Sequence, residues 1–85
     1  MARPKSPEAL AKGITRAVHE ATKHKPPPYW ISVETIMRTL GLADWDAVDL
    51  AVQHAERQNW LRADSATKAH SLCITQSGIV MLGKS

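Results

Sequence analysis

The feature that most constrains the fold is the stretch 32–62, which reads as two helices joined by a tight turn, with a strand starting immediately afterwards. In its first half, four apolar residues follow the spacing i, i+3, i+4 and i+7 that places side chains on one helix face. These residues are Val33, Ile36, Met37 and Leu40. Ser32 can cap the start of this helix, and Gly41 can adopt the left-handed conformation that ends it. The first half therefore predicts a helix over residues 32–41.

The second half of the stretch predicts another helix, over residues 44–59. Asp44 can cap its start, and Asn59 can take the left-handed conformation that stops a helix before Trp60. The buried face of this helix is expected to consist of Val48, Ala51, Val52 and Ala55. Two short helices with a glycine in the turn match the helix-turn-helix pattern, and any helical hairpin in a small α-helical domain shows the same spacing.

The residues before this stretch predict a first helix over 6–25. Ser6 can cap it, Pro7 suits the first helical position, and Glu8 places a carboxylate near the positive end of the helix dipole. The triple proline 26–28 ends it, and residues 29–31 read as a short extended segment.

The residues after the stretch predict a β-hairpin, in which 60–64 pairs antiparallel with 70–75. Thr75 can then cap a final helical turn. The apolar side chains expected to let this turn close the core are Ile79, Val80 and Leu82.

The 85 residues allow one domain, which we place at residues 6–85 after a disordered tail at 1–5. A single cysteine rules out an intramolecular disulfide. The N-terminal residues lack the apolar segment of a secretory signal, and no apolar run approaches the roughly 20 residues that span a bilayer. We therefore expect a cytoplasmic protein with no membrane partner.

The core is expected to combine residues from all these elements: Leu10, Ile14, Val18, Ile36, Leu40, Val48, Val52, Leu61, Leu72 and Ile74. In such a core Leu40→Ala would cost about 2–5 kcal/mol. We expect Trp30 and Trp45 to lie at the core edge rather than to act as base-stacking platforms, because so small a core needs large apolar side chains.

The order of helix, short strand, helix, turn, helix, hairpin and terminal helix resembles the winged helix-turn-helix family, especially its MarR-like and ArsR-like transcriptional regulators. The matching segments are Ser32 to Ala55, Asn59-Trp60-Leu61, and Ile74-Thr75-Gln76-Ser77-Gly78. The resemblance implies an α+β fold: a single winged helix-turn-helix domain with a three-helix core, a β-hairpin wing and a short C-terminal helix. Two positions depart from the family pattern. Asn59 replaces a glycine, and Asp44-Trp45-Asp46 stands where DNA-binding relatives carry serine, threonine or arginine.

The resemblance also implies a small DNA-binding protein, a transcriptional regulator with double-stranded DNA as its partner. On the outward face of the third helix, Gln53 can pair with adenine and Arg57 with guanine, and His54 flanks them. The other DNA contacts are expected from the helix start and the wing: Ser32, Arg62, Lys68 and His70.

The distribution of charge favours a second hypothesis. Residues 1–25 carry six cations against two carboxylates, whereas residues 32–59 carry two cations against five. A carboxylate facing phosphates is repelled, so Asp46 and Asp49 oppose DNA binding unless they serve only the helix dipole. The alternative is a winged-helix protein–protein interaction module that uses Asp46, Asp49 and Leu50. A homodimer through the first helix is a further possibility.

The remaining motifs predict no enzyme, cofactor or metal site. Residues 78–85 fit the letters of a phosphate-binding loop, but no helix follows to hold the phosphate. His54, His70 and Cys73 are too dispersed for a zinc site, and His19 and His24 do not share a helix face. We expect Cys73 to be a small, partly buried strand residue.

Overall fold

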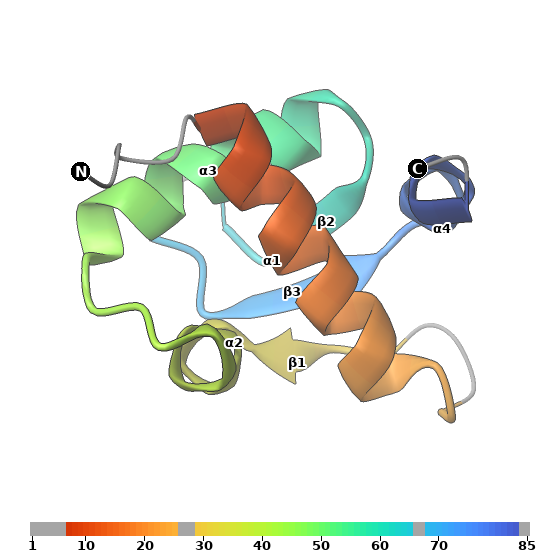
Figure 1. Ribbon diagram of the computed structural model, residues 1–85, viewed down its shortest axis with the longest axis horizontal. Coiled ribbons are helices and arrows are strands. Elements are labelled where there is room, and N and C mark those ends of the chain that lie inside the picture. Colours follow the sequence, from red (N-terminus) through yellow and green to blue (C-terminus); the bar gives the residue numbers. More distant parts are fainter. Residues whose placement is uncertain (1–6, 26–28, 66–67, 84–85) are drawn as a thin grey trace, which may run out of the picture.

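The computed structural model describes residues 7–25, 29–65 and 68–83, whose arrangement is shown in Figure 1. The elements follow in the order α1 (Pro7–Thr22), β1 (Ile31–Ser32), α2 (Val33–Leu40), α3 (Trp45–Arg57), β2 (Leu61–Ala63), β3 (Ser71–Ile74) and α4 (Gln76–Gly83). They form a small α+β domain that is compatible with a winged-helix layout. The predicted tail at 1–5, the Ser6 cap and the triple proline lie outside the described residues.

The predicted signals at the ends of α2 and α3 are confirmed. The Ser32 side chain accepts from the Thr35 N–H, and Asp44 accepts from the Ala47 N–H at 3.1 Å. Gly41 ends α2 with φ +69°, and Asn59 follows α3 with φ +63°. Both residues occupy the left-handed region that glycine and asparagine reach most easily.

The first helix is shorter than predicted, because α1 ends at Thr22 and not near residue 25. The Lys25 N–H donates to the Thr22 carbonyl oxygen at 2.9 Å in a turn. A residue that precedes a proline is disfavoured in the helical conformation, and Lys25 precedes Pro26 in the sequence.

The predicted hairpin is confirmed as the pairing of β2 with β3, and β1 adds a third antiparallel strand on the other side of β3. Leu61 pairs with Ile74, and Ala63 pairs with Leu72. Because side chains alternate between the two faces of a strand, these residues share the face that packs on the core. Arg62, which pairs with Cys73, lies on the opposite face.

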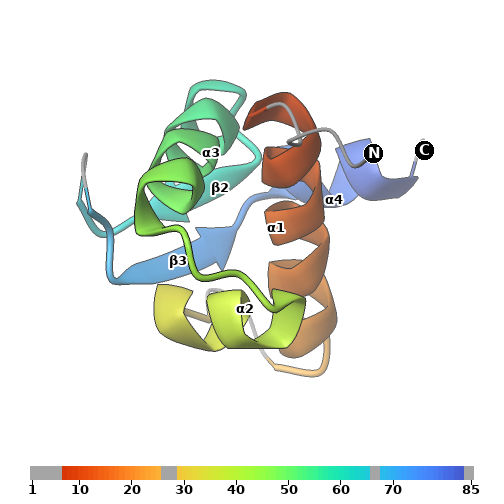
Figure 2. The ribbon, with the colours of Figure 1, turned by 60° about the vertical axis from the view of Figure 1, so that its left-hand side comes forward.

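The core lies where α1 packs against α2, α3 and β3. Figure 1 shows α1 passing in front of α3 and the sheet, and Figure 2 shows the same elements from the side. Eight of the ten predicted core residues are buried: Leu10, Ile14, Val18, Ile36, Val48, Val52, Leu61 and Leu72. Ile74 is partly buried and packs against this cluster.

Leu40 is the predicted core residue that is wrong, since 38% of its surface is exposed. It is the last residue of α2, where the helix has passed beyond the core. Met37 is buried instead, and Leu42 packs against the core from the turn that follows. The helical spacing was correct, but the helix is too short for its fourth apolar residue to reach a partner.

Two further expectations about apolar side chains are also wrong. Trp30 and Trp45 are both exposed, and among the tryptophans it is Trp60 that packs against the core. In α4, the side chains of Ile79 and Val80 are exposed, although α4 was expected to close the core with them. The buried residue of α4 is Gly78, which lies against the Trp60 backbone.

Candidate functional site

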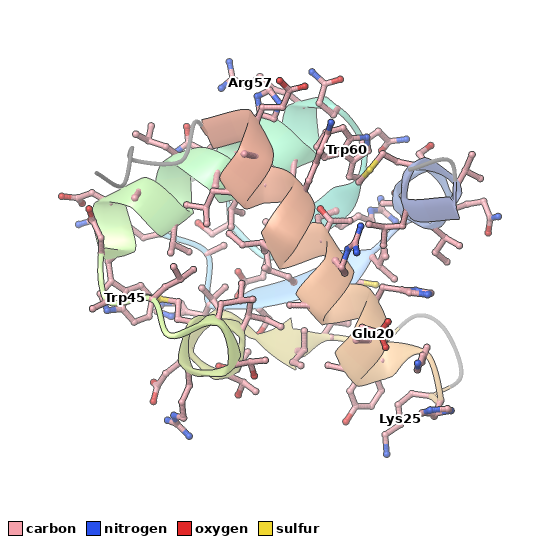
Figure 3. All side chains as sticks on the ribbon, viewed as in Figure 1. Glu20, Lys25, Trp45, Arg57 and Trp60 are labelled. Carbon is pink, nitrogen blue, oxygen red and sulfur yellow. The ribbon has the colours of Figure 1, made fainter. Side chains whose placement is uncertain are left out.

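The outward face of α3 is the surface that sequence reasoning assigned to a partner. Figure 3 shows Trp45 and Arg57 at opposite ends of this helix. Between them, Leu50 is 54% exposed, and at the first end Trp45 is 53% exposed. Asp46 is also exposed, and among the described residues it has no ion-pair or hydrogen-bond partner. The exposed surface of α3 therefore presents two large apolar side chains, Trp45 and Leu50, on different sides of the helix, together with the Asp46 carboxylate.

Beside this face lies a hollow of about 360 Å³. It is formed by α3, the start of α2 and the loop between β2 and β3, of which the structure describes residues 64–65 and 68–70. We call it the α3–hairpin hollow. Its lining consists of Val33, Trp45, Asp46, Val48, Asp49, Val52, Lys68, Ala69 and His70. The lining is thus mainly apolar, with four ionisable side chains at its rim.

Asp49 ties α3 to the hairpin loop. One carboxylate oxygen accepts from the Lys68 backbone N–H at 2.8 Å, and the other accepts from Gln53 Nε2 at 3.1 Å. Lys68 has φ +50°, a conformation that costs a non-glycine residue about 1 kcal/mol or more. The hydrogen bond to Asp49 helps to offset that cost. Both carboxylate oxygens of Asp49 are therefore hydrogen-bonded within the molecule.

Asp64 fixes the other side of the same loop. Its carboxylate accepts from the His70 backbone N–H at 2.8 Å, while its own N–H donates to the Ser71 carbonyl oxygen at 3.2 Å. Backbone hydrogen bonds from His70 and Ser71 lower the pKa of the Asp64 carboxyl. The loop that borders the hollow is thus held by two aspartates, one from α3 and one from the end of β2.

The lowered pKa of Asp64 predicts acid sensitivity of this loop. A carboxyl whose folded pKa is depressed contributes stability above its unfolded value of about 3.9, and this stability is lost as the pH falls through the folded value. We expect the amide proton shift of His70 to titrate below about pH 3.9, and Asp64→Asn to abolish that titration. An NMR pH titration of both proteins checks this. A His70 shift that titrates identically in Asp64→Asn would refute the assignment.

The seven predicted DNA contacts do not converge on one surface. Lys68 and His70 line the α3–hairpin hollow, whereas Arg57 lies at the far end of α3. Ser32 pairs with Ser71, and Arg62 with Cys73, so Ser32 and Arg62 lie on the sheet face opposite to Leu61 and Leu72.

The remaining two contacts are engaged within the molecule. Gln53 is half-buried and bonded to Asp49. The His54 ring meets Trp60 edge-on, with centroids 5.8 Å apart, and its Nε2 is buried with no partner among the described residues. That nitrogen is therefore enclosed by protein atoms.

Sequence reasoning missed Trp45 as a surface residue and Asp49 as a tie to the hairpin. Trp45 lies three residues before Val48 and seven before Val52, so helical spacing places it beside the buried stripe, and periodicity gave no signal that it is exposed. The bond from Asp49 to Lys68 joins residues 19 positions apart, and no periodicity marks such a pair.

Other candidate sites find little support in the described part of the chain. Residues 78–83 belong to α4, so the letters of the phosphate-loop motif fall on a helix. Within residues 7–25, 29–65 and 68–83, no three His, Cys, Asp or Glu side chains are grouped to hold a metal ion. Cys73 is buried in β3. No helix among the described residues has the length and apolar character needed to cross a bilayer.

Comparison with known proteins adds no relative. No protein-family model, curated protein or solved structure matches the chain.

Proposed function

We propose that this chain is a protein-interaction module that binds its partner through the α3–hairpin hollow and the adjoining face of α3. One observation carries the proposal: Trp45 and Leu50 are each more than half exposed on the helix that borders an apolar hollow. Tryptophan is among the residues that contribute most to protein interfaces, because its large rigid ring loses little conformational freedom on binding.

The charges of this surface support a protein partner over a nucleic acid. Asp46 is exposed beside Trp45 and would face phosphates without compensation. A protein partner can instead place an apolar side chain in the hollow, against Val48 and Val52, and a lysine or arginine opposite Asp46.

Double-stranded DNA is the second candidate, as the resemblance to transcriptional regulators implies. The specific observation that favours it is the engagement of Asp49 by Lys68 and Gln53, which removes one of the two carboxylates held against DNA binding. Lys68, His70 and Arg57 remain exposed for phosphates. Binding by so few cations would be weak and strongly dependent on salt.

The proposal is tested by selecting binders from a phage-displayed library of random peptides. We expect peptides that bind the wild type and lose about tenfold or more of their affinity on Trp45→Ala, as for a central interface tryptophan. Trp30→Ala is the matched control, because Trp30 is exposed to a similar extent but does not line the hollow. Peptides that bind both variants equally, or no selected peptide at all, would contradict the proposal.

A parallel titration with a labelled mixed-sequence duplex at two salt concentrations tests the DNA candidate. Asp46→Ala and Asp49→Ala remove the same charge, but Asp49→Ala also removes the contact that holds the hairpin loop. If DNA binds here, Asp46→Ala tightens binding and Asp49→Ala does not. Absence of duplex binding by both the wild type and Asp46→Ala at low salt would exclude DNA. If Asp46→Ala tightens duplex binding and no selected peptide depends on Trp45, DNA would be the partner of this surface and the proposal of a protein partner would be wrong.

A further inference from the structure

A second hollow, of about 210 Å³, lies between the end of α1, the sheet and α4. We call it the α1–α4 hollow. Its lining consists of His19, Thr22, Lys23, Lys25, Tyr29, Cys73, Ile74 and Ile79. In both Figures 1 and 2, α4 lies on the side of the molecule away from the loop between β2 and β3. The two hollows therefore occupy different surfaces.

The residues that line the α1–α4 hollow include two lysines, Lys23 and Lys25, and no carboxylate. The imidazole of His19 lines it as well. The nearby Glu20 pairs with Lys23 at 2.7 Å, and that hydrogen bond lowers the pKa of Glu20. Figure 3 shows Glu20 and Lys25 at the same end of α1. Cations at the end of a helix interact favourably with its dipole, but the dipole does not explain why an apolar floor lies beside them.

The floor and the α4 side of this hollow are apolar. Tyr29 is 42% exposed and Ile79 is 38% exposed, and Ile74 at the end of β3 is partly buried against the core. No charged residue occurs in α4 from Gln76 to Gly83. A helix that is apolar on all sides usually packs against something on every side, yet α4 leaves Ile79 and Val80 uncovered.

The chemistry of this hollow suits a peptide better than a nucleic acid. The Lys25 ammonium lies 5.7 Å from the centre of the Tyr29 ring, over its face, so that face is already taken and is not free to stack on a base. The floor offers aliphatic carbon and a buried thiol, which do not read the edges of bases. An aliphatic side chain flanked by carboxylates satisfies both the apolar floor and the cationic rim.

We propose that the α1–α4 hollow docks an acidic peptide segment of another protein. An aliphatic side chain of that segment inserts between Tyr29 and Ile79, and neighbouring carboxylates pair with Lys25 and accept a hydrogen bond from the His19 imidazole. This surface is separate from the α3–hairpin hollow, so this proposal can be tested independently of the function proposed above.

The experiment uses a short labelled peptide in which pairs of leucine alternate with pairs of glutamate, titrated into the full chain at low salt. We expect Lys25→Glu to weaken binding about five- to tenfold, since it turns a rim attraction into a repulsion. Lys12→Glu is the matched control. It makes the same charge change on the exposed face of α1, about 15 Å before the helix end by the rise of 1.5 Å per residue.

A second matched pair tests the apolar floor. Ile79→Ser and Val80→Ser each remove an exposed aliphatic side chain from α4, but only Ile79 lines the hollow. We expect Ile79→Ser to weaken binding about tenfold and Val80→Ser to leave it nearly unchanged. Both variants replace an exposed aliphatic side chain of α4 by serine. A difference in peptide affinity between them is therefore due to the contact at the hollow and not to a general effect on the fold.

Several results would overturn the proposal. One is that the peptide does not bind at low salt. Another is that Lys25→Glu and Lys12→Glu, or Ile79→Ser and Val80→Ser, lose peptide affinity equally. Binding of an oligothymidine strand that is weakened by Lys25→Glu, with no peptide binding, would assign the surface to a nucleic acid. Concentration-dependent sedimentation of the chain alone that Lys25→Glu abolishes would assign it to a second copy, whose acidic α3 would then be the occupant.

Discussion

Replacing Gly78 by alanine is expected to destabilise the domain by about 1–3 kcal/mol or more, by forcing α4 away from the rest of the molecule. A Cβ atom at this position would lie 2.2 Å from the carbonyl oxygen of Trp60 and 3.1 Å from Ile74 Cγ1. The first neighbour is backbone, and it already accepts a hydrogen bond from the Thr75 N–H at 3.0 Å. It cannot move aside without breaking the start of α4. Relative to a total stability of about 4–13 kcal/mol for a chain of this length, the loss is large.

Gly13→Ala is the matched control for this prediction. Gly13 lies inside α1, and a Cβ atom there would meet nothing within 4 Å. Alanine is favoured over glycine within a helix by about 0.8–1 kcal/mol, so this variant is expected to be more stable than the wild type. Urea unfolding followed by tryptophan fluorescence measures both. A Gly78→Ala variant as stable as the wild type would show that α4 does not pack on Trp60 as described.

The local signals of this chain were sufficient to predict most of the fold. Ser32, Gly41, Asp44 and Asn59 each act on backbone groups within a few residues, so their effect can be read without knowledge of the tertiary structure. The pairing of β2 with β3 was also predicted, because the two strands are close in sequence. Periodicity also indicated the buried faces of α1, α2 and α3, except at Leu40, but it failed for α4, where Ile79 and Val80 are exposed.

The candidate site could be predicted only in part, because its geometry depends on contacts between distant residues. Sequence reasoning placed Lys68 and His70 in the wing as DNA contacts, and it treated Asp46 and Asp49 as equivalent. In the structure Asp49 bonds to Lys68 while Asp46 remains exposed, and only the approach of the hairpin loop to α3 separates the two. The exposure of Trp45 is likewise set by where neighbouring elements end. Periodicity within one helix does not contain that information.

Leu40 was predicted to be buried from helical spacing alone, which does not show where a helix ends relative to the core. The second large effect that we expect is the loss of stability on shortening the buried neighbour Ile36. Ile36→Ala should cost about 2–5 kcal/mol, because Ile36 is only 1% exposed and its loss leaves a cavity between α2 and the core. Leu40→Ala should cost less than about 1 kcal/mol, because much of its side chain already contacts water and alanine is a good helix former. Each variant removes an aliphatic side chain of the same size from one helix, so burial is the main difference between them.

Urea unfolding of the two variants measures this difference directly, provided that the free energy of unfolding falls with urea concentration at the same rate in both. The midpoint of Ile36→Ala is expected to fall well below that of Leu40→Ala. Equal losses would mean that Leu40 is covered in solution. A repeat at several protein concentrations would then show the source of the cover. A loss of stability in Leu40→Ala that grows with protein concentration would identify a second copy lying on the end of α2. A loss that is independent of concentration would place Leu40 in the core of the monomer, and it would contradict the description of Leu40 as an exposed residue at the end of α2.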